Sequence, residues 1–172
     1  MKGELLGKKV IVWDKRAEKL FEKEFTGRFD DEKLELSLIE AAYLLEKKMI
    51  TIESSSLKKF LSYCKKQDPR FDLRFTVYKD LRKRGLPTRT GFKFGCDFRV
   101  YEKGIKPLKR GPKEAKEHTK WVVFAVPINY KLSYPELSRA ARLAHNIRAK
   151  MIWGLVDKKN RVSYYSMKFF KP

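Results

Sequence analysis

Short hydrophobic runs and helical repeats alternate along the first half of the chain. The apolar run 10–13 predicts a buried strand that ends at a polar turn. Apolar residues then recur at helical spacing from Leu38 to Met49, and Ser37 is well placed as the N-cap of that helix. Two further helices are predicted: one over 57–66, and one that carries Leu73, Val77 and Leu81 on one face and stops at Gly85 and Pro87.

After Pro87 the pattern is typical of strands. The segment 121–126 is apolar throughout, which favours a central position in a sheet. The remaining predictions are strands over 91–101, 151–156 and 161–170, and a helix from Pro135 to about Lys150. Together the elements predict an α/β (α+β) chain with a small N-terminal α/β domain, residues 1–70, and a C-terminal mixed-sheet domain, residues 71–172.

The charge narrows the class of partner. Among 172 residues, 41 Lys and Arg against 21 Asp and Glu give a net charge of +20, which is typical of proteins that bind nucleic acids. The alternative is a basic surface that is merely solvated. Cys64 and Cys96 have no paired metal-ligand spacing, so neither a metal site nor a disulfide framework is expected, and a reducing, cytoplasmic setting fits. No signal peptide and no apolar run of roughly 20 residues is present, which predicts a soluble protein without a membrane partner.

Three residues are candidates for proton transfer. RNA can be cut through its own 2′-hydroxyl when a base removes the hydroxyl proton and an acid protonates the leaving 5′-oxygen. His118 follows a basic loop and precedes a buried strand, whereas His145 lies within a helix, where a packing role is expected. Tyr101 ends a strand, so its hydroxyl is expected near solvent, and cationic neighbours would have to favour its phenolate. An ordinary strand-end tyrosine is the alternative.

Several ordered motifs of the chain resemble the archaeal tRNA-splicing endonucleases. In the C-terminal half these are the segments 78–85, 90–101, 117–118, 142–148 and 155–157, and in the N-terminal half the segment 34–41 is similar. The resemblance implies a nuclease-type C-terminal domain. It also implies a metal-independent endoribonuclease, without a cofactor, that excises introns from precursor tRNA at bulge-helix-bulge sites and leaves a 2′,3′-cyclic phosphate and a 5′-hydroxyl.

The resemblance also implies roles for individual residues. Tyr101 matches the family's general base and His118 its general acid. Arg142 matches an arginine at the start of the last helix that clamps an unpaired bulge base, and Arg161 is a weaker candidate for the same clamp.

The family's third catalytic residue, a lysine, is displaced or missing here. Ala149 stands directly after Arg148, where that lysine is expected, and Lys150 follows. One residue turns a helix by about 100°, so Lys150 would point elsewhere if the helix continued. One interpretation is that Ala149 marks an inactivated position. The other is that Lys150 takes the role through a local shift, since a long side chain can recover a position near a helix end.

Two further departures concern binding and assembly. The segment 104–117 resembles a lengthened loop and is strongly basic, so it is either a solvated insertion or an added contact with RNA; its cations are Lys106, Lys109, Arg110, Lys113 and Lys116.

The family assembles by placing an acidic loop of one subunit in a basic groove of another. The matching loop here, 127–133, has no acid. A second, acidic-loop-bearing subunit is therefore expected, in a two-plus-two tetramer that also pairs copies of this chain through the C-terminal strand.

The missing lysine leaves a second function open. A non-catalytic structural or RNA-binding subunit of the same complex would not need a lysine at Ala149. The presence of both Tyr101 and His118 speaks against it, because such a subunit has no use for an acid and a base. A generic basic RNA-binding protein is a more distant alternative.

Overall fold

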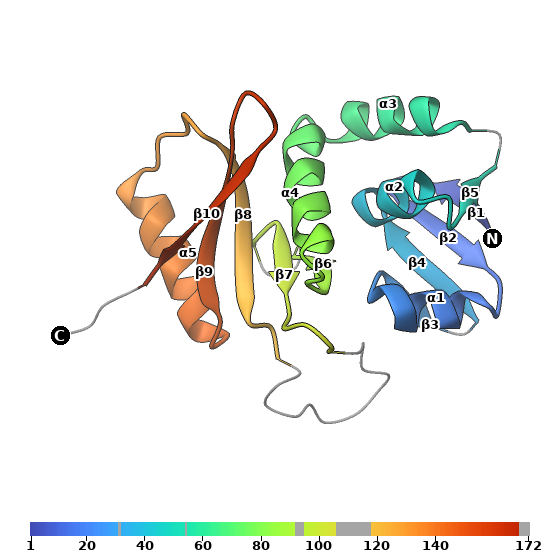
Figure 1. Ribbon diagram of the computed structural model, residues 1–172, viewed down its shortest axis with the longest axis horizontal. Helices are drawn as coiled ribbons and strands as arrows, with labels where there is room; N and C mark the ends of the chain where they lie inside the picture. Colours follow the sequence, from blue (N-terminus) through green and yellow to red (C-terminus); the bar gives the residue numbers. More distant parts are fainter. Residues whose placement is uncertain (31, 54, 92–94, 106–117, 169–172) are drawn as a thin grey trace. The chain divides into compact units, whose positions relative to one another are not determined.

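The chain forms two compact units, Met1–Phe75 and Thr76–Pro172. The computed structural model describes residues 1–30, 32–53, 55–91, 95–105 and 118–168. Each unit contains a five-stranded sheet with helices packed against it (Figure 1). The fold is α+β, as the sequence predicts. Within the described ranges, no helix has the length and apolar character needed to cross a membrane.

The first unit is a mixed sheet in the order β3-β4-β2-β1-β5, in which β1 and β5 run parallel and the other neighbours run antiparallel. Its elements are β1 (Lys2–Leu6), β2 (Lys9–Trp13), α1 (Ala17–Glu24), β3 (Arg28–Asp30), β4 (Lys33–Ser37), α2 (Leu38–Glu46), β5 (Thr51–Ile52) and α3 (Leu57–Gln67). The strand at β2 and the helices at α2 and α3 are confirmed. The sequence patterns did not predict β1, α1, β3, β4 or β5.

The core of the first unit lies on one face of its sheet. Val10 and Val12 of β2 and Leu34 and Leu36 of β4 are fully buried on that face. Gly3 of β1 belongs to the same face, because a Cβ there would lie 2.8 Å from a methyl group of Val10. Alternation of inward and outward side chains along each strand therefore fixes the register of this sheet.

A capping box begins α2. The Glu40 amide donates to Ser37 Oγ, and Glu40 Oε2 in return accepts from the Ser37 amide at 2.9 Å. The other oxygen of the buried Glu40 carboxylate accepts from the Gly27 amide at 3.0 Å. One carboxylate thus satisfies amides of both the helix start and the preceding chain.

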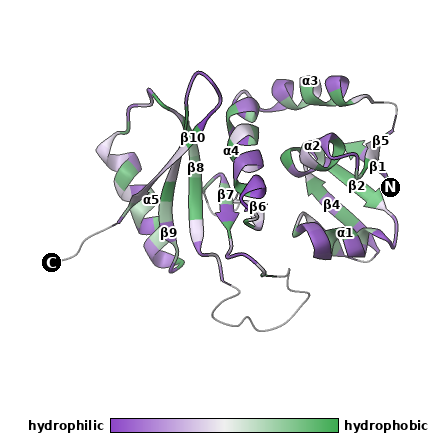
Figure 2. Cartoon of the chain, viewed as in Figure 1, coloured by the Kyte–Doolittle hydropathy of each residue, from purple (hydrophilic) through white to green (hydrophobic). Residues whose placement is uncertain are grey.

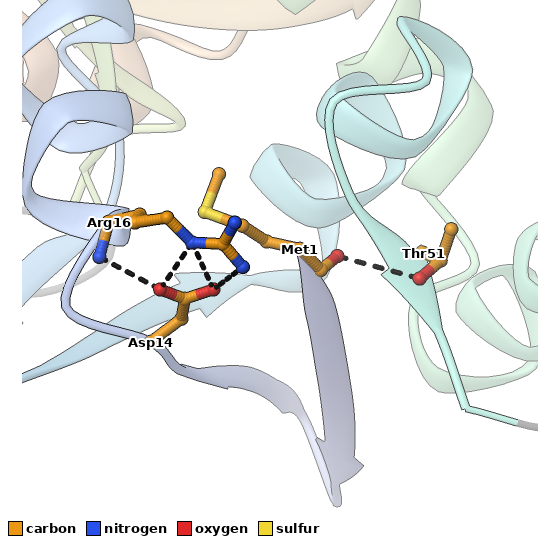
Figure 3. A network of polar contacts seen from close by, with 4 residues as sticks. All are labelled: Met1, Asp14, Arg16 and Thr51. Atoms are coloured by element: carbon orange, nitrogen blue, oxygen red, sulfur yellow. Dashed lines mark hydrogen bonds and ion pairs between the residues drawn. The ribbon is translucent and has the colours of Figure 1, made fainter.

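Figure 3 shows two sets of polar contacts in this unit, one in the turn between β2 and α1 and one between the start of the chain and β5. The Asp14 carboxylate accepts from the amide and the guanidinium of Arg16, and these hydrogen bonds, the side-chain ones foremost, hold the pKa of Asp14 below its usual value. The Met1 carbonyl accepts from the Thr51 amide at 2.8 Å and from the Thr51 hydroxyl, which extends the parallel pairing of β1 with β5.

The second unit is built around a sheet in the order β10-β9-β8-β7-β6. Only β8 and β9, among the strand pairs that the structure describes here, run parallel. The elements are α4 (Phe71–Lys83), which begins in the first unit, β6 (Thr88–Thr90), β7 (Phe98–Val100), β8 (Trp121–Pro127), α5 (Tyr134–Asn146), β9 (Lys150–Val156) and β10 (Val162–Met167). The central position of β8 and the helix at α4 are confirmed.

A helix covers each face of this sheet. On one face, the Tyr78 ring of α4 lies 5.6 Å from the Phe98 ring, and Val77 packs over Gly154 at 3.2 Å from its ideal Cβ position. On the other face, Ala140 and Ala144 of α5 join one buried cluster with Val122, Met151 and Trp153. The central strands β8 and β9 are accordingly hydrophobic along most of their length (Figure 2).

Two predicted elements are wrong in extent. The strand expected over 91–101 is formed only at Phe98–Val100, because a turn and bends occupy 95–97; residues 92–94 lie outside the described residues. The last helix ends at Asn146 rather than near Lys150. Arg148 has a positive φ of 55°, and Lys150 is already the first residue of β9. The final strand covers Val162–Met167, within the expected 161–170.

Candidate active site

Three strand ends meet at one edge of the second sheet. The Lys120 amide donates to the Val100 carbonyl at 2.9 Å, and the Lys150 amide donates to the Lys120 carbonyl at the same distance. β7 therefore ends, and β8 and β9 begin, side by side (Figure 1). We call this the site edge and define it by Tyr101, His118, Lys120, Ala149 and Lys150.

The glycine-rich motif before Tyr101 is a scaffold for β7. The Gly91 amide donates to the Asp97 carbonyl at 2.9 Å, and the Asp97 amide donates to Val123 of β8. The buried Asp97 carboxylate accepts from the Ala125 amide at 2.8 Å. A side chain at Gly91 would meet the Cys96 sulfur at 2.4 Å. The motif thus fastens the start of β7 to β8 and fixes where Tyr101 emerges.

Tyr101 directly follows β7 and its amide donates to the Pro87 carbonyl at 2.9 Å. The expectation that its hydroxyl lies near solvent is wrong, since only 3% of the residue is exposed. His118 is exposed and lies three residues before β8, at the position the sequence indicates. The sheet register therefore brings the segments of the tyrosine and the histidine to the same edge.

Two residues of α5 differ from their expected surroundings. His145 is exposed in the last turn, so a packing role for it is wrong. Arg142 lies in the second half of α5, not at the start of the last helix as the resemblance implies. Its side chain is exposed, and Nε donates to the Ser138 carbonyl at 3.4 Å. Arg142 precedes the buried Ala144, whose carbonyl accepts from the Ala149 amide, by two residues, so the two side chains face different sides of α5.

Ala149 and Lys150 are placed by a strand start and not by a helix. The Ala149 amide donates to the Ala144 carbonyl at 2.8 Å, and Ala149 packs against the cluster beneath α5. Lys150 is exposed, opposite Trp121, and shares its side of β9 with Gly154, which faces α4. Consecutive strand residues point to opposite faces. The helical rotation of about 100° therefore does not apply here, and Ala149 and Lys150 point to different sides of the sheet.

Some candidate residues are not brought to this edge. Arg161 lies in the turn after β9, where its Nε contacts Asp157 at 2.7 Å, and hydrogen bonds from the Arg161 amide and then its side chain lower the pKa of Asp157. The seven residues of β9 separate that turn from the site edge by roughly 20 Å. The other basic candidates lie outside the described residues: Lys106, Lys109, Arg110 and Lys113.

The sequence patterns missed one cation of the site edge, Lys120. Its ammonium pairs with Glu102 at 2.5 Å, and both side chains are nearly half exposed. The available signal was its place two residues after His118 and directly before a buried strand. In the described part of the chain, no group of three or more His, Cys, Asp and Glu side chains is arranged to hold a metal ion.

Comparison with known proteins identifies the family. The family model for the catalytic C-terminal domain of the tRNA intron endonucleases matches residues 71–164, and the model for their N-terminal domain matches residues 1–63. The tRNA-splicing endonuclease of Thermococcus kodakarensis is 37% identical over 172 residues, which cover 97% of this chain and 96% of that protein.

Two more relatives agree. The tRNA-splicing endonuclease of Thermococcus onnurineus is 35% identical over 92% of this chain and 89% of its own length. That of Nanoarchaeum equitans is 35% identical, and the match covers 100% of both chains. These names support the cleavage of tRNA introns as the general activity. The chain belongs to the tRNA intron endonuclease family.

Proposed function

We propose that this chain is a catalytic subunit that cuts precursor tRNA at the splice sites of bulge-helix-bulge RNA. The observation that carries this is the meeting of the Tyr101 and His118 segments at one edge of one sheet. A structural subunit would not require an acid and a base at that edge. The net charge of +20 favours a polyanionic substrate.

The reaction we propose is an internal transesterification. Tyr101, as the phenolate, takes the proton from the 2′-hydroxyl and becomes the neutral phenol, and the 2′-oxygen attacks the adjacent phosphorus. The bond from phosphorus to the 5′-oxygen breaks, and His118 gives its proton to that oxygen. The products are a 2′,3′-cyclic phosphate and a 5′-hydroxyl. Because Tyr101 is 3% exposed, RNA binding has to uncover its hydroxyl.

Substrate positioning falls to the arginine and lysine side chains. Arg142 lies in the second half of α5 with an exposed side chain, and its guanidinium can stack on an unpaired base. Arg161 is the poorer candidate, because Asp157 holds it at the opposite end of β9. The basic segment that contains Lys106, Lys109, Arg110 and Lys113 is proposed to contact phosphates on sequence grounds alone.

The position of Ala149 favours the inactivated interpretation over a shifted Lys150. Ala149 packs on the α5 side of the sheet, and Lys150 takes the α4 side. We expect Ala149→Lys to raise the cleavage rate strongly and Lys150→Ala in that background to change it little. Single-turnover cleavage of a precursor tRNA measures both. Loss of all residual cutting in Lys150→Ala alone would instead show that Lys150 has taken the role.

Assembly is proposed to require a second subunit. The loop after β8 has no acidic residue, so it cannot enter a basic groove of its own kind favourably. β10 is the edge strand of its sheet, and Tyr165 on it is 57% exposed. Pairing of β10 with the β10 strand of a second copy would cover the unpaired side of this strand. Two such chains with two acidic-loop subunits form the proposed tetramer.

The test is cleavage in the presence of EDTA. The chain is incubated with precursor tRNA, alone and with the acidic-loop subunit, and the product ends are analysed. Cyclic phosphate ends that survive chelation support the proposal, and ends that require a divalent metal contradict it.

Ala149 also favours the second candidate, a non-catalytic subunit. That candidate predicts that the complex cuts equally well with Tyr101→Phe and with the unchanged chain.

A further inference from the structure

Lys120 occupies the middle of the site edge. The Lys120 amide donates to the carbonyl of Val100, the residue directly before Tyr101. The Lys120 carbonyl accepts from the amide of Lys150, the residue directly after Ala149. Neighbouring strands are about 4.8 Å apart. The backbone of Lys120 is therefore bonded on one side to the segment of Tyr101 and on the other side to the segment of Ala149.

The ammonium of Lys120 is held weakly. It contacts Glu102 Oε1 at 2.5 Å and lies 5.9 Å from the centre of the Trp121 ring. The side chains of Lys120 and Glu102 are 42% and 47% exposed. An ion pair as exposed as this adds little to stability, so an arriving phosphate can replace the carboxylate at little cost. Charge-assisted contacts to phosphate are stronger than neutral hydrogen bonds.

We propose that Lys120 supplies the phosphate-stabilising cation that Ala149 cannot supply. This rests on the proposed function and names a further residue of that reaction. In the free chain the ammonium is held by Glu102, the residue that follows Tyr101. When RNA binds, Lys120 leaves Glu102 and contacts a non-bridging oxygen of the scissile phosphate, where negative charge grows as the 2′-oxygen attacks. No proton passes through Lys120.

The other cations near the edge are placed less well. Arg148 precedes Ala149 in a backbone of positive φ and is exposed beyond the helix end. Lys103 lies two residues after Tyr101 in a loop, near Gly85. Lys120 alone, among the described lysines of this edge, has backbone hydrogen bonds to both neighbouring segments.

The test compares variants in two backgrounds under single-turnover conditions, with the chain in complex with the acidic-loop subunit. In the unchanged chain, Lys120→Ala should lower the cleavage rate by about 100-fold at saturating enzyme. Lys120→Arg should retain part of that rate. In the Ala149→Lys background, Lys120→Ala should cost less than about threefold, because two neighbours that serve one role are not additive. Lys158→Ala, an exposed lysine of the far turn, is the matched control and should not change the rate.

A second variant separates chemistry from structure. Glu102→Gln removes the competing carboxylate and keeps the lysine, so it should leave the rate unchanged or raise it. If the pair only stabilises the edge, Glu102→Gln and Lys120→Ala will lower the rate and the melting temperature together, and the proposal is overturned. A change in RNA affinity and its salt dependence, with no change in the saturating rate, also overturns it.

The two levels of the proposal fail differently. If Ala149→Lys cuts and the unchanged chain does not, Lys120 supplies no catalytic cation, while the roles proposed for Tyr101 and His118 stand. If neither cuts in the assembled complex, the proposed function itself is wrong. Circular dichroism of each variant shows whether it folds, and Lys120→Gln replaces Lys120→Ala if the latter does not.

Discussion

Because Gly91 has no side chain, the chain before β7 can pack closely against Cys96. An added Cβ would lie 2.4 Å from the Cys96 sulfur and 2.7 Å from the Cys96 carbonyl oxygen, so something must move. We expect Gly91→Ala to destabilise the C-terminal domain by about 1–3 kcal/mol, the range for overpacking. Denaturation by urea, followed by fluorescence, measures this.

A neighbouring glycine provides the control. Gly95 has a φ of 67° and open space around its Cβ position, so Gly95→Ala reports the backbone cost alone, about 1–2 kcal/mol. Combining Gly91→Ala with Cys96→Ala should restore only part of the stability, because the backbone oxygen of Cys96 remains close. Full restoration would show that the sulfur is the sole obstacle.

The two cysteines are buried, free thiols. Burial raises the pKa of Cys64 to about 12 and that of Cys96 to about 11 from an ordinary value of 9.0. Since the thiolate is the reactive form, iodoacetamide at pH 8 should modify both slowly in the folded chain and rapidly in urea. Mass spectrometry of timed samples measures this. Rapid modification of Cys96 under native conditions would show that the β7 scaffold opens readily.

At the scale of elements, the start of α5 depends on one carboxylate. Glu136 accepts from the Tyr130 hydroxyl at 2.6 Å and from the amide and hydroxyl of Ser133. These hydrogen bonds, the one from Tyr130 foremost, lower the pKa of Glu136 from 4.5 to about 2. The stabilisation is therefore complete above pH 4.5 and is lost as the pH falls toward 2.

Replacing this carboxylate should make the melting temperature depend less steeply on pH in acid. Glu136→Gln should have a lower melting temperature than the unchanged chain at pH 7, and the difference should shrink as the pH falls through the window below 4.5. Melting followed by circular dichroism across that window measures it. Glu46→Gln, at the exposed C-terminal side of α2, is a comparison outside the capping box. A difference that stays constant with pH would contradict the role of the charge.

Elements with strong periodicity were predictable, and those set by neighbours were not. Caps and apolar spacing were enough for α2, α3 and α4, because Ser37 and Ser56 cap the starts of α2 and α3 and Gly85 follows the end of α4. β1 was missed because Gly3, which lies on the inner face of that strand, has no side chain to contribute to an alternating pattern. Val10 of the next strand fills the space instead. The end of α5 was missed because a helical pattern continues past Asn146, and only the pairing of β9 with β8 ends it.

The candidate site shows the same division. Tyr101 and His118 were recognisable from motifs, and the structure brings their segments together. The burial of Tyr101, the exposure of His145 and the place of Lys120 depend on contacts across the sheet, which spacing along the chain does not contain. Ala149 was noticed as a departure, but the face it occupies follows only from the start of β9.

At the scale of the whole molecule, assembly should decide activity. Purified alone, the chain should be a dimer or poorly active, because the loop after β8 lacks the acids that would complete a tetramer. Light scattering on a gel-filtration column gives the mass, and adding the acidic-loop subunit should produce both the larger species and the cleavage activity. A stable, active homotetramer would contradict the requirement for a partner.

β8 and β9 run parallel, and this separates two tasks in space. Both strands run in the same direction away from the site edge. The loop after β8 and the turn after β9 therefore begin side by side at the opposite end of the strands, where the Ile128 amide donates to the Val156 carbonyl. Changes of length or composition at that opposite end do not shift the register of Tyr101, Lys120 and Ala149. A lineage could therefore exchange partners through those loops while its chemistry stayed constant, and an engineer could attach a fluorophore or tether at Lys158 without touching the reaction.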